Sequence, residues 1–185
     1  MDDRGAISWT GRPEADELLE RSPLALLIGM LLDQQVKMEK AFNGPYDLQQ
    51  RLGSLDAAAI AALDPDRLDQ VFRERPALHR FPGSMAKRVQ QLCGVIAERY
   101  GNDAEALWRG VESGAELSRR IGALPGFGPD KTRIMVSVLA KKRGVRPAGW
   151  EDFGASWHSI ADVDSPETMV EARLVKRARK EAEQS

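Results

Sequence analysis

The stretch LPGFGPDKT, Leu124 to Thr132, decides how the second half of the chain folds. Gly126 and Gly128 can adopt backbone conformations that other residues avoid, and Pro129 suits the first position of a helix because no N–H partner is needed there. The run ELSRRIGAL precedes this stretch and RIMVSVLAKK follows it, both with apolar residues at helical spacing. The sequence therefore predicts two helices joined by a tight hairpin.

Such a hairpin has a physical use beyond turning the chain. Its backbone amides lie next to the positive end of a helix, which makes a ready seat for an anion. Lys131 and Thr132 fall in the first turn of that helix, where an ammonium group and a hydroxyl can join in. A phosphate of a nucleic-acid backbone fits this seat without any reading of bases. We therefore expect Gly126, Gly128 and Thr132 to contact DNA.

Charge is unevenly distributed in a molecule whose net charge is only −1. Residues 118–148 contain eight basic side chains, Arg133 among them, against a single acid. The stretch 76–92 adds Arg80, Lys87 and Arg88 with no acid. A local positive region in a near-neutral protein favours a polyanion docked on one face, with Lys87 and Arg133 as contacts. The alternative is that these are ordinary solvated helix faces.

Composition excludes several classes of protein. A chain of 185 residues with 42% hydrophobic residues is expected to form one globular domain. No apolar run approaches the roughly 20 residues that span a bilayer, and the polar N-terminus does not resemble a secretory signal, so a cytoplasmic protein is expected. Cys93 is the single cysteine, and the two histidines lie far apart in the sequence. No metal site built from side chains is expected, and Cys93 is interpreted as a core residue.

The rest of the sequence predicts an all-α protein, because period-two alternation is almost absent. Ser22-Pro23 is typical of a helix start, and the apolar run behind it predicts a central helix that continues to a stop at Asn43-Gly44-Pro45. The long amphipathic stretch FPGSMAKRVQQLCGVIAERYG predicts another helix. Further helices are predicted in YDLQQRLG, SLDAAAIAAL, DPDRLDQVFRE, DAEALWRG and residues 166–185, and a loop-rich segment anchored by tryptophans in between.

Three stretches in this order resemble the helix-hairpin-helix base-excision DNA glycosylases of the HhH-GPD superfamily. LPGFGPDKT is similar to the hairpin of that family, and LLIGMLLDQQV to its early core helix with a glutamine element facing the DNA. FPGSMAKRVQQLCGVIAERYGND is similar to the helix that precedes the hairpin by one short helix. The agreement in order and spacing covers about residues 20–145. Because one cysteine cannot hold an iron–sulfur cluster, the chain resembles a short form of the family without such a cluster.

The resemblance also implies a two-lobed all-α fold with a central cleft between the lobes, into which a damaged or mispaired base is rotated. Residues 1–185 would form one domain, with core helices of the first lobe in about 22–122, the hairpin in 123–143, and 1–21 with 144–185 completing the second lobe. Gln34 and Gln35 would probe the gap left by the base, since an amide can pair with exposed base edges. Alternatively, these glutamines simply end the apolar stretch of a helix.

Catalysis in the family rests on an aspartate and, in the members that also cut the strand, on a lysine of the hairpin's second helix. Lys131 is the nearest lysine, but the family usually has Pro-Gly-x-Gly-x-Lys, whereas this chain has one residue more before the lysine. Gapless alignment places Asp130 on the lysine position, and a shift of one residue turns a side chain by about 100° around a helix. Either an extra hairpin residue restores the register, or Lys131 points elsewhere.

The expected aspartate is also irregular. Asp152, next to Glu151 in RPAGWEDF, is the carboxylate nearest to the family's spacing, and it could stabilise the sugar cation or activate water. Both acids could equally be exposed loop charges. Trp150 beside them is either a stacking surface for the base or a core anchor. Asp162 and Asp164 are the poorer candidates.

These observations favour a DNA glycosylase that cleaves the N-glycosidic bond of an abnormal base in double-stranded DNA. Strand cutting is left open by the shifted lysine. We expect a monomer that binds no membrane and needs no cofactor; a monovalent cation at the hairpin of the DNA-bound form is also left open. One alternative is a non-catalytic protein that binds DNA structures and has lost the catalytic pair. A protein-interaction module that uses the hairpin only as a corner is the third hypothesis.

Overall fold

The apolar run behind Ser22 forms the buried centre of the molecule. In the computed structural model, which describes residues 4–185, this run is helix α2 (Pro23–Leu32). The Ser22 hydroxyl accepts a hydrogen bond from the backbone N of Ala25, and Pro23 occupies the first turn. Every residue from Leu24 to Leu32 is buried. A helix that is apolar on all sides has to be surrounded by other helices, and this one is.

Helices account for about two thirds of the described chain. Between Arg4 and Ser185 no strand forms, and there is one isolated backbone bridge, between Ser113 and Ala148. The remaining α-helices and short 3₁₀ helices (η) are α1 (Pro13–Arg21), α3 (Met38–Leu52), α4 (Ala57–Ala62), α5 (Pro65–Arg73), α6 (Pro82–Arg99), η1 (Ala104–Leu107), α7 (Gly114–Gly122), α8 (Pro129–Arg143), η2 (Trp150–Asp152), η3 (Ile160–Asp162) and α9 (Pro166–Gln184). The predicted all-α fold is confirmed.

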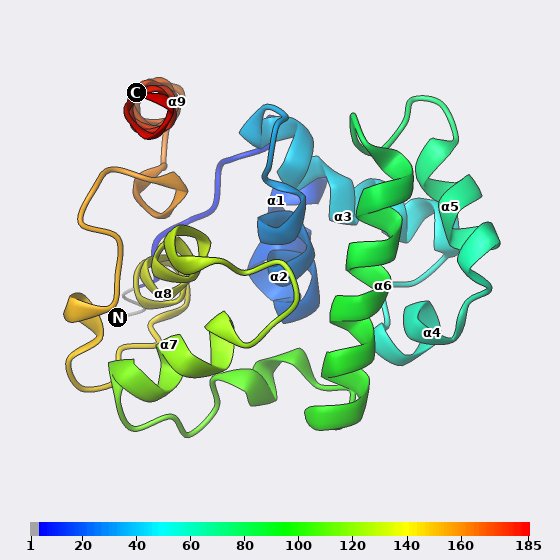
Figure 1. Cartoon of the computed structure of the whole chain (residues 1–185), viewed down its shortest axis with the longest axis horizontal. Coiled ribbons are helices and arrows are strands. Elements are labelled where there is room, and N and C mark those ends of the chain that lie inside the picture. Colours follow the sequence, from blue (N-terminus) through cyan, green and yellow to red (C-terminus); the bar gives the residue numbers. More distant parts are fainter. Residues whose placement is uncertain (1–3) are drawn as a thin grey trace.

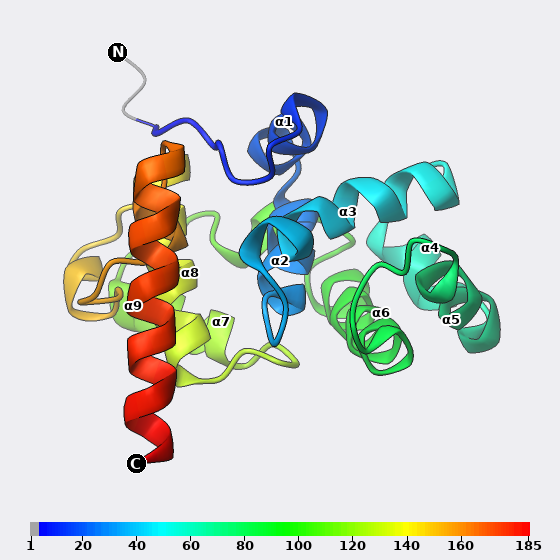
Figure 2. The same ribbon diagram turned by 90° about the horizontal axis from the view of Figure 1, so that it is seen from above.

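Two groups of helices lie on opposite sides of α2 (Figures 1 and 2). On one side, α4 and α5 pack on α6, and α3 packs on both α2 and α5. On the other side, α7 packs on α8, and α8 also contacts η2 and η3. The sequence grouped α7 with the first lobe, but its contacts are with α8. Met1 to Asp3, which the sequence placed in the second lobe, lie outside the described residues.

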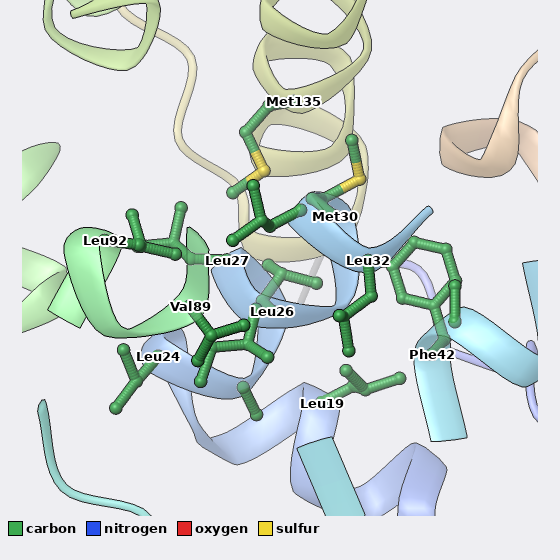
Figure 3. Close-up of a cluster of buried hydrophobic side chains, with 14 of the residues drawn as sticks. Leu19, Leu24, Leu26, Leu27, Met30, Leu32, Phe42, Val89, Leu92 and Met135 are labelled. Atoms are coloured by element: carbon green, nitrogen blue, oxygen red, sulfur yellow. The ribbon is translucent and has the colours of Figure 1, made fainter. Parts of the chain in front are cut away.

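The core is continuous across α2 (Figure 3). Val89 and Leu92 of α6 meet it from one side, Phe42 of α3 from another and Met135 of α8 from a third. All four side chains are fully buried. Both groups of helices therefore pack on one central element, and the elements that carry the hairpin are fixed relative to those that carry the glutamines.

The long helix predicted to run from residue 24 to a stop at Asn43-Gly44-Pro45 is wrong in two ways. It breaks earlier, after Leu32, and α3 then continues through the predicted stop. Gly44 suits this helix because a Cβ there would lie 2.5 Å from Leu32 Cδ1. Asn43 donates to the carbonyls of Glu39 and Thr10, so the residues that usually end a helix are held inside one by packing.

Two further elements differ from the prediction. Helix α1, which was not predicted, precedes α2, and the predicted helix in DAEALWRG is only the short 3₁₀ helix η1. The segment before α1 crosses to the far end of α8, where Gly5 N donates to Lys141 O (2.9 Å) and Lys142 Nζ donates to Ala6 O (3.1 Å). Among residues 4–185, no helix is long and apolar enough to cross a membrane.

Candidate active site at the hairpin

The hairpin between α7 and α8 is anchored from within. Leu124 and Phe127 bury their side chains in the core, and Phe127 N donates to Leu124 O (3.2 Å) to close the turn. Gly126 has φ +84°, and a Cβ there would lie 2.3 Å from Leu31 Cδ1. Glycine is therefore required at this position both for backbone conformation and for the close approach of α2. The predicted helix–hairpin–helix is present.

The N-terminus of α8 is open at the surface. Gly128 precedes its first residue, is exposed, and has no atom within 4 Å of the position that a Cβ would take. Within residues 4–185, no side chain caps this end of α8. The first N–H groups of a helix have no partner inside the helix, so they remain available to an anion. The arrangement expected for a phosphate seat is thus formed at Gly128.

Thr132 does not take part in that opening. Its side chain is buried, and its hydroxyl donates to Phe127 O (3.4 Å) inside the hairpin. Its backbone N donates to Gly128 O (2.9 Å) as the first helical hydrogen bond of α8. The side chain therefore stabilises the hairpin and is turned away from the surface where phosphate would bind.

Lys131 points toward the C-terminal end of α2. Its Nζ donates to the carbonyl of Leu31 at 3.2 Å, and its side chain is half-buried in the wall of a pocket. Asp130 lies at the rim of the same pocket, exposed, with Oδ2 3.2 Å from Arg179 Nη2. Of the two residues that competed for the lysine position, the lysine is the one that reaches α2.

Burial gives this lysine an unusual acidity. It lowers the pKa of Lys131 from 10.5 to about 8, because the charged form is poorly solvated there. The carboxylate of Asp33 opposes this shift, and the positive charges of Lys176 and Arg88 reinforce it. With a pKa of about 8, roughly a tenth of the Lys131 side chains are neutral at pH 7. The neutral amine is the nucleophilic form.

The pocket beside Lys131 has a volume of about 280 Å³. Its floor is apolar, formed by Met30, Met38 and Ile134 from three helices. The segment between η2 and α9 provides Trp157 and His158, and α9 provides the remaining wall. The size is near the lower end for small-molecule sites, and a flat group can lie against Trp157.

Helix α9 is held against the pocket by ion pairs. Arg173 pairs with Glu39, Lys176 Nζ lies 2.7 Å from Asp33 Oδ1, and Arg179 reaches Asp130. Arg179 also stacks on Trp157, with the guanidinium carbon 3.5 Å from the ring centroid. Met169 and Ala172 are the two buried side chains of this 19-residue helix. Besides these ion pairs, α9 packs on η3.

The break between α2 and α3 forms a loop, residues 33–37, whose first residue, Asp33, lines the pocket. Gln34 donates through Nε2 to Leu31 O (2.9 Å) and accepts from Arg88 Nη1 (2.7 Å), so its side chain is held. Gln35 is exposed and has φ +56°, a conformation uncommon for residues other than glycine. Of the two glutamines, Gln35 is therefore the one free to meet a ligand.

A buried histidine fixes this loop to the start of α6. His79 Nε2 lies 3.1 Å from Leu32 O and 3.0 Å from Gln34 O, and its Nδ1 accepts from Phe81 N (3.0 Å). Phe81 is 40% exposed, with the Arg80 guanidinium 5.3 Å from its ring centroid. Lys87 and Arg88 are exposed one to two turns further along α6. An exposed aromatic ring, cations and Gln35 therefore share one edge of the molecule.

Asp152 and Trp150 are not brought to Lys131. Asp152 is exposed in η2, away from the residues that line the pocket, and its backbone carbonyl accepts from Arg133 Nη1 (3.2 Å). Trp150 is half-buried and packs against Gly114 and Gly154, where a Cβ would meet its atoms. Trp150 thus serves as a core anchor here, and Arg133 ties η2 to α8.

The other two candidate aspartates lie near the opposite end of α8. Asp162 pairs with Lys141 and accepts from Ser159 N (2.9 Å). Burial raises the pKa of Asp162, but these two hydrogen bonds outweigh it, and the pKa is lowered overall. Asp164 Oδ1 accepts from the Thr168 hydroxyl at the start of α9. Ten residues of α8, about 15 Å, separate Lys141 from Lys131, so neither aspartate reaches the pocket.

Several residues of this region were not predicted as functional. Asp33 was included in LLIGMLLDQQV only as part of a motif, although a carboxylate after ten apolar residues is a signal in itself. In the sequence, the cations of α9 were typical of an ordinary charged helix end, and Trp157 was interpreted as an anchor of the loop-rich segment. Between Arg4 and Ser185, no group of three or more His, Cys, Asp or Glu side chains is arranged to hold a metal ion.

Comparison with known proteins agrees with this geometry. No curated protein matches the sequence. Residues 28–183 match the family described as HhH-GPD superfamily base excision DNA repair protein. This match covers α3 to α8 completely and nearly all of α9, including the hairpin and both walls of the pocket. The chain therefore belongs to the HhH-GPD superfamily of base excision DNA repair proteins.

Proposed function

We propose that this protein is a DNA glycosylase that cleaves the N-glycosidic bond of a damaged or mispaired base placed in the Lys131 pocket. The observation that carries the proposal is Lys131 itself: a half-buried lysine with a pKa of about 8, in the first turn of the hairpin helix and in the wall of a pocket. Glycosylases need an unpaired base to leave the duplex, and such a pocket can receive one.

The chemistry follows from a neutral amine at that place. Lys131 Nζ forms a bond to C1′ of the sugar while the bond between C1′ and the base breaks, and its electron pair leaves with the base, which is then protonated. The sugar ring opens, its oxygen takes up the proton released from Nζ, and an iminium linkage remains. In this reading the enzyme also has lyase activity, since the iminium is the species from which strand cleavage proceeds.

DNA would lie along the edge that carries Gly128, Gln35 and Phe81. The open amides at Gly128 would bind a backbone phosphate, with Lys87 and Arg88 as further phosphate contacts. Gln35 and the exposed ring of Phe81 would meet the bases next to the extruded nucleotide, because an aromatic ring can stack on any base. We propose that a monomer acts in this way in the cytoplasm, without an iron–sulfur cluster.

A second candidate is a DNA-structure-binding protein without catalysis. One observation favours it: two carboxylates that line the pocket, Asp33 and Asp130, are ion-paired with α9, and Asp152 lies elsewhere. This candidate keeps the phosphate seat but needs no reactive lysine.

Base release and covalent trapping distinguish the two candidates. Duplexes that each contain one damaged or mispaired base would be incubated with the protein, with and without borohydride. We expect free base and a reduced protein–DNA adduct, both lost in Lys131→Ala. Lys180→Ala is the control, since Lys180 is an exposed lysine at the rim of the same pocket. Binding of duplex without base release on any substrate would support the second candidate.

A further inference from the structure

We propose that Asp33, and not Asp152, is the carboxylate that works with Lys131. The inference rests on the proposed function, because it names the second reactive group of the same pocket. It starts from the acids that line the pocket, which are Asp33, Asp130 and Glu183. Glu183 is exposed, and the side chain of Asp130 is 52% exposed, whereas that of Asp33 is only 10% exposed.

Asp33 is held in place by the end of α2. Its backbone N donates to Gly29 O (3.1 Å) and Met30 O (3.3 Å), and it is the residue at which the helix ends. The carbonyl that accepts from Lys131 belongs to Leu31, two residues earlier. The same helix end therefore positions the amine and the carboxylate, and both line the same pocket.

Helix α9 supplies the carboxylate's other partner. Lys176 Nζ lies 2.7 Å from Asp33 Oδ1. Asp33 is thus ion-paired with the ammonium group of α9 and lines the same pocket as Lys131 of α8, whose pKa it raises. Because the side chain of Asp33 is only 10% exposed, its interactions with nearby charged groups are weakly screened by water.

This placement gives Asp33 two tasks in the reaction. The proton that leaves the Lys131 ammonium passes to the Asp33 carboxylate, the neutral amine bonds to C1′, and the departing base takes up the proton from Asp33. The carboxylate is then charged again and faces the positive charge on the sugar. No oxidant, reductant or further reactant is needed, and each proton is accounted for.

The charged groups around Lys131 come from several helices, and each of them can influence how the activity depends on pH. They are Asp33 at the end of α2, Arg88 of α6, Asp130 of α8, the two histidines His79 and His158, and Lys176, Arg179, Lys180 and Glu183 of α9. Asp33 raises the pKa of Lys131, and Lys176 lowers it. Removing the charge of Asp33 therefore lowers the pKa of Lys131, and removing the charge of Lys176 raises it.

The test compares isosteric variants. Asp33→Asn is expected to slow base release on the order of 100-fold and to shift the acid limb of the pH–rate profile to lower pH. Lys176→Met is expected to shift that limb to higher pH. Asp69→Asn is the control, because Asp69 forms an exposed ion pair with Arg73 on α5, far from the pocket. A purely structural role of Asp33 would lower activity without moving the profile.

Two further measurements keep the outcomes distinguishable. Thermal unfolding shows whether Asp33→Asn is folded, and ¹³C NMR of reductively methylated lysines gives the pKa of Lys131 directly, with Lys131→Arg for assignment. If Asp33→Asn keeps full activity and Asp152→Asn abolishes it, the Asp33 assignment is overturned and the glycosylase stands. If the wild-type protein releases no base and traps no adduct, the proposed function itself fails, and the catalytic role of Asp33 fails with it.

Discussion

Lys131 places an ammonium group where the folded protein solvates it poorly. The pKa of this group is about 8 in the native state and 10.5 when the chain is unfolded. Below pH 8 both states carry the proton, and the native state bears the full penalty of the buried charge. Between pH 8 and 10.5 the unfolded chain binds more protons than the native protein, so this contribution to stability rises with pH.

A stability measurement can detect this penalty. We expect Lys131→Met to be more stable than the wild type at pH 7, by up to roughly 3 kcal/mol from a shift of this size. The difference should shrink between pH 8 and 10.5 and level off above it. Urea unfolding of both proteins at a series of pH values checks this, and other titrating groups cancel in the comparison. A difference that is independent of pH would mean that Lys131 is not desolvated.

Single site residues were predictable to different degrees. The place of Lys131 in the first turn of α8 was predictable, because a lysine just behind a Gly/Pro-rich hairpin stays in that turn even when the loop gains one residue. Its catalytic role stays a prediction. Asp152 was chosen by its spacing to Lys131, but spacing says nothing of the direction in which a 3₁₀ turn carries a side chain. The hydroxyl of Thr132 donates to the Phe127 carbonyl inside the hairpin, and no sequence pattern predicts this side-chain orientation.

The hairpin as an element contains two glycines with different physical roles. Gly126 is needed for folding, because φ is +84° and Leu31 Cδ1 fills the space of a Cβ. Gly128 has ordinary φ of −74° and open space around it. A methyl group is therefore incompatible with the first position and harmless to the fold at the second.

The matched pair Gly126→Ala and Gly128→Ala separates these roles. We expect Gly126→Ala to lower the free energy of unfolding by roughly 2–4 kcal/mol, through left-handed backbone strain and overpacking. Gly128→Ala should stay within about 0.5 kcal/mol of the wild type. It should bind duplex DNA roughly fivefold more weakly, because the added methyl group stands in the open space through which a phosphate would approach the amides. Urea unfolding and fluorescence anisotropy measure the two effects. Unchanged DNA binding in Gly128→Ala would remove the phosphate seat from the proposal.

A helix was predictable where the local sequence and the tertiary packing favour the same structure. The end of a helix was not predictable where the packing overrides the local sequence. The cap-plus-proline starts at Ser22, Asp64 and Ser165 all begin helices. The break after Leu32 is different, because Lys131 and His79, which lie far away in the sequence, contact the carbonyls of Leu31, Leu32 and Gln34. A local sequence pattern cannot reveal such long-range partners. For the same reason it did not predict that α3 continues through Pro45.

For the whole molecule, the family resemblance predicted more than the residue pattern could. The all-α fold follows from periodicity, but two groups of helices around α2 were an expectation from the resemblance alone. The position of α9 could not be foreseen, since its ion pairs join it to α3, to the loop after α2 and to α8. The pairs of Arg173 with Glu39 and of Arg179 with Asp130 are partly exposed and contribute at most about 1 kcal/mol each. In the third pair, the side chain of Asp33 is only 10% exposed.

Cys93 reports on opening of the whole core. Its side chain is fully buried on α6, and burial raises the pKa of the thiol to about 12. We expect no reaction with a disulfide reagent at pH 8 in the native protein, because the thiolate is the reactive form. Reactivity should rise with urea along the same transition as the loss of helical circular dichroism. Rapid labelling without urea would show that α6 opens separately from the rest.

One residue, Leu31, joins the two halves of the molecule at the pocket. Its side chain lies against Gly126, and its carbonyl accepts from both Lys131 and Gln34. Lys131, the proposed nucleophile, and the hairpin are therefore both attached to the end of α2. In the proposed reaction, bulkier bases would have to be accommodated on the other side of the pocket, where ion pairs of Arg173, Lys176 and Arg179 join α9 to the rest of the molecule. Variants of α9 and Trp157 are therefore the first place to look for a change in substrate range.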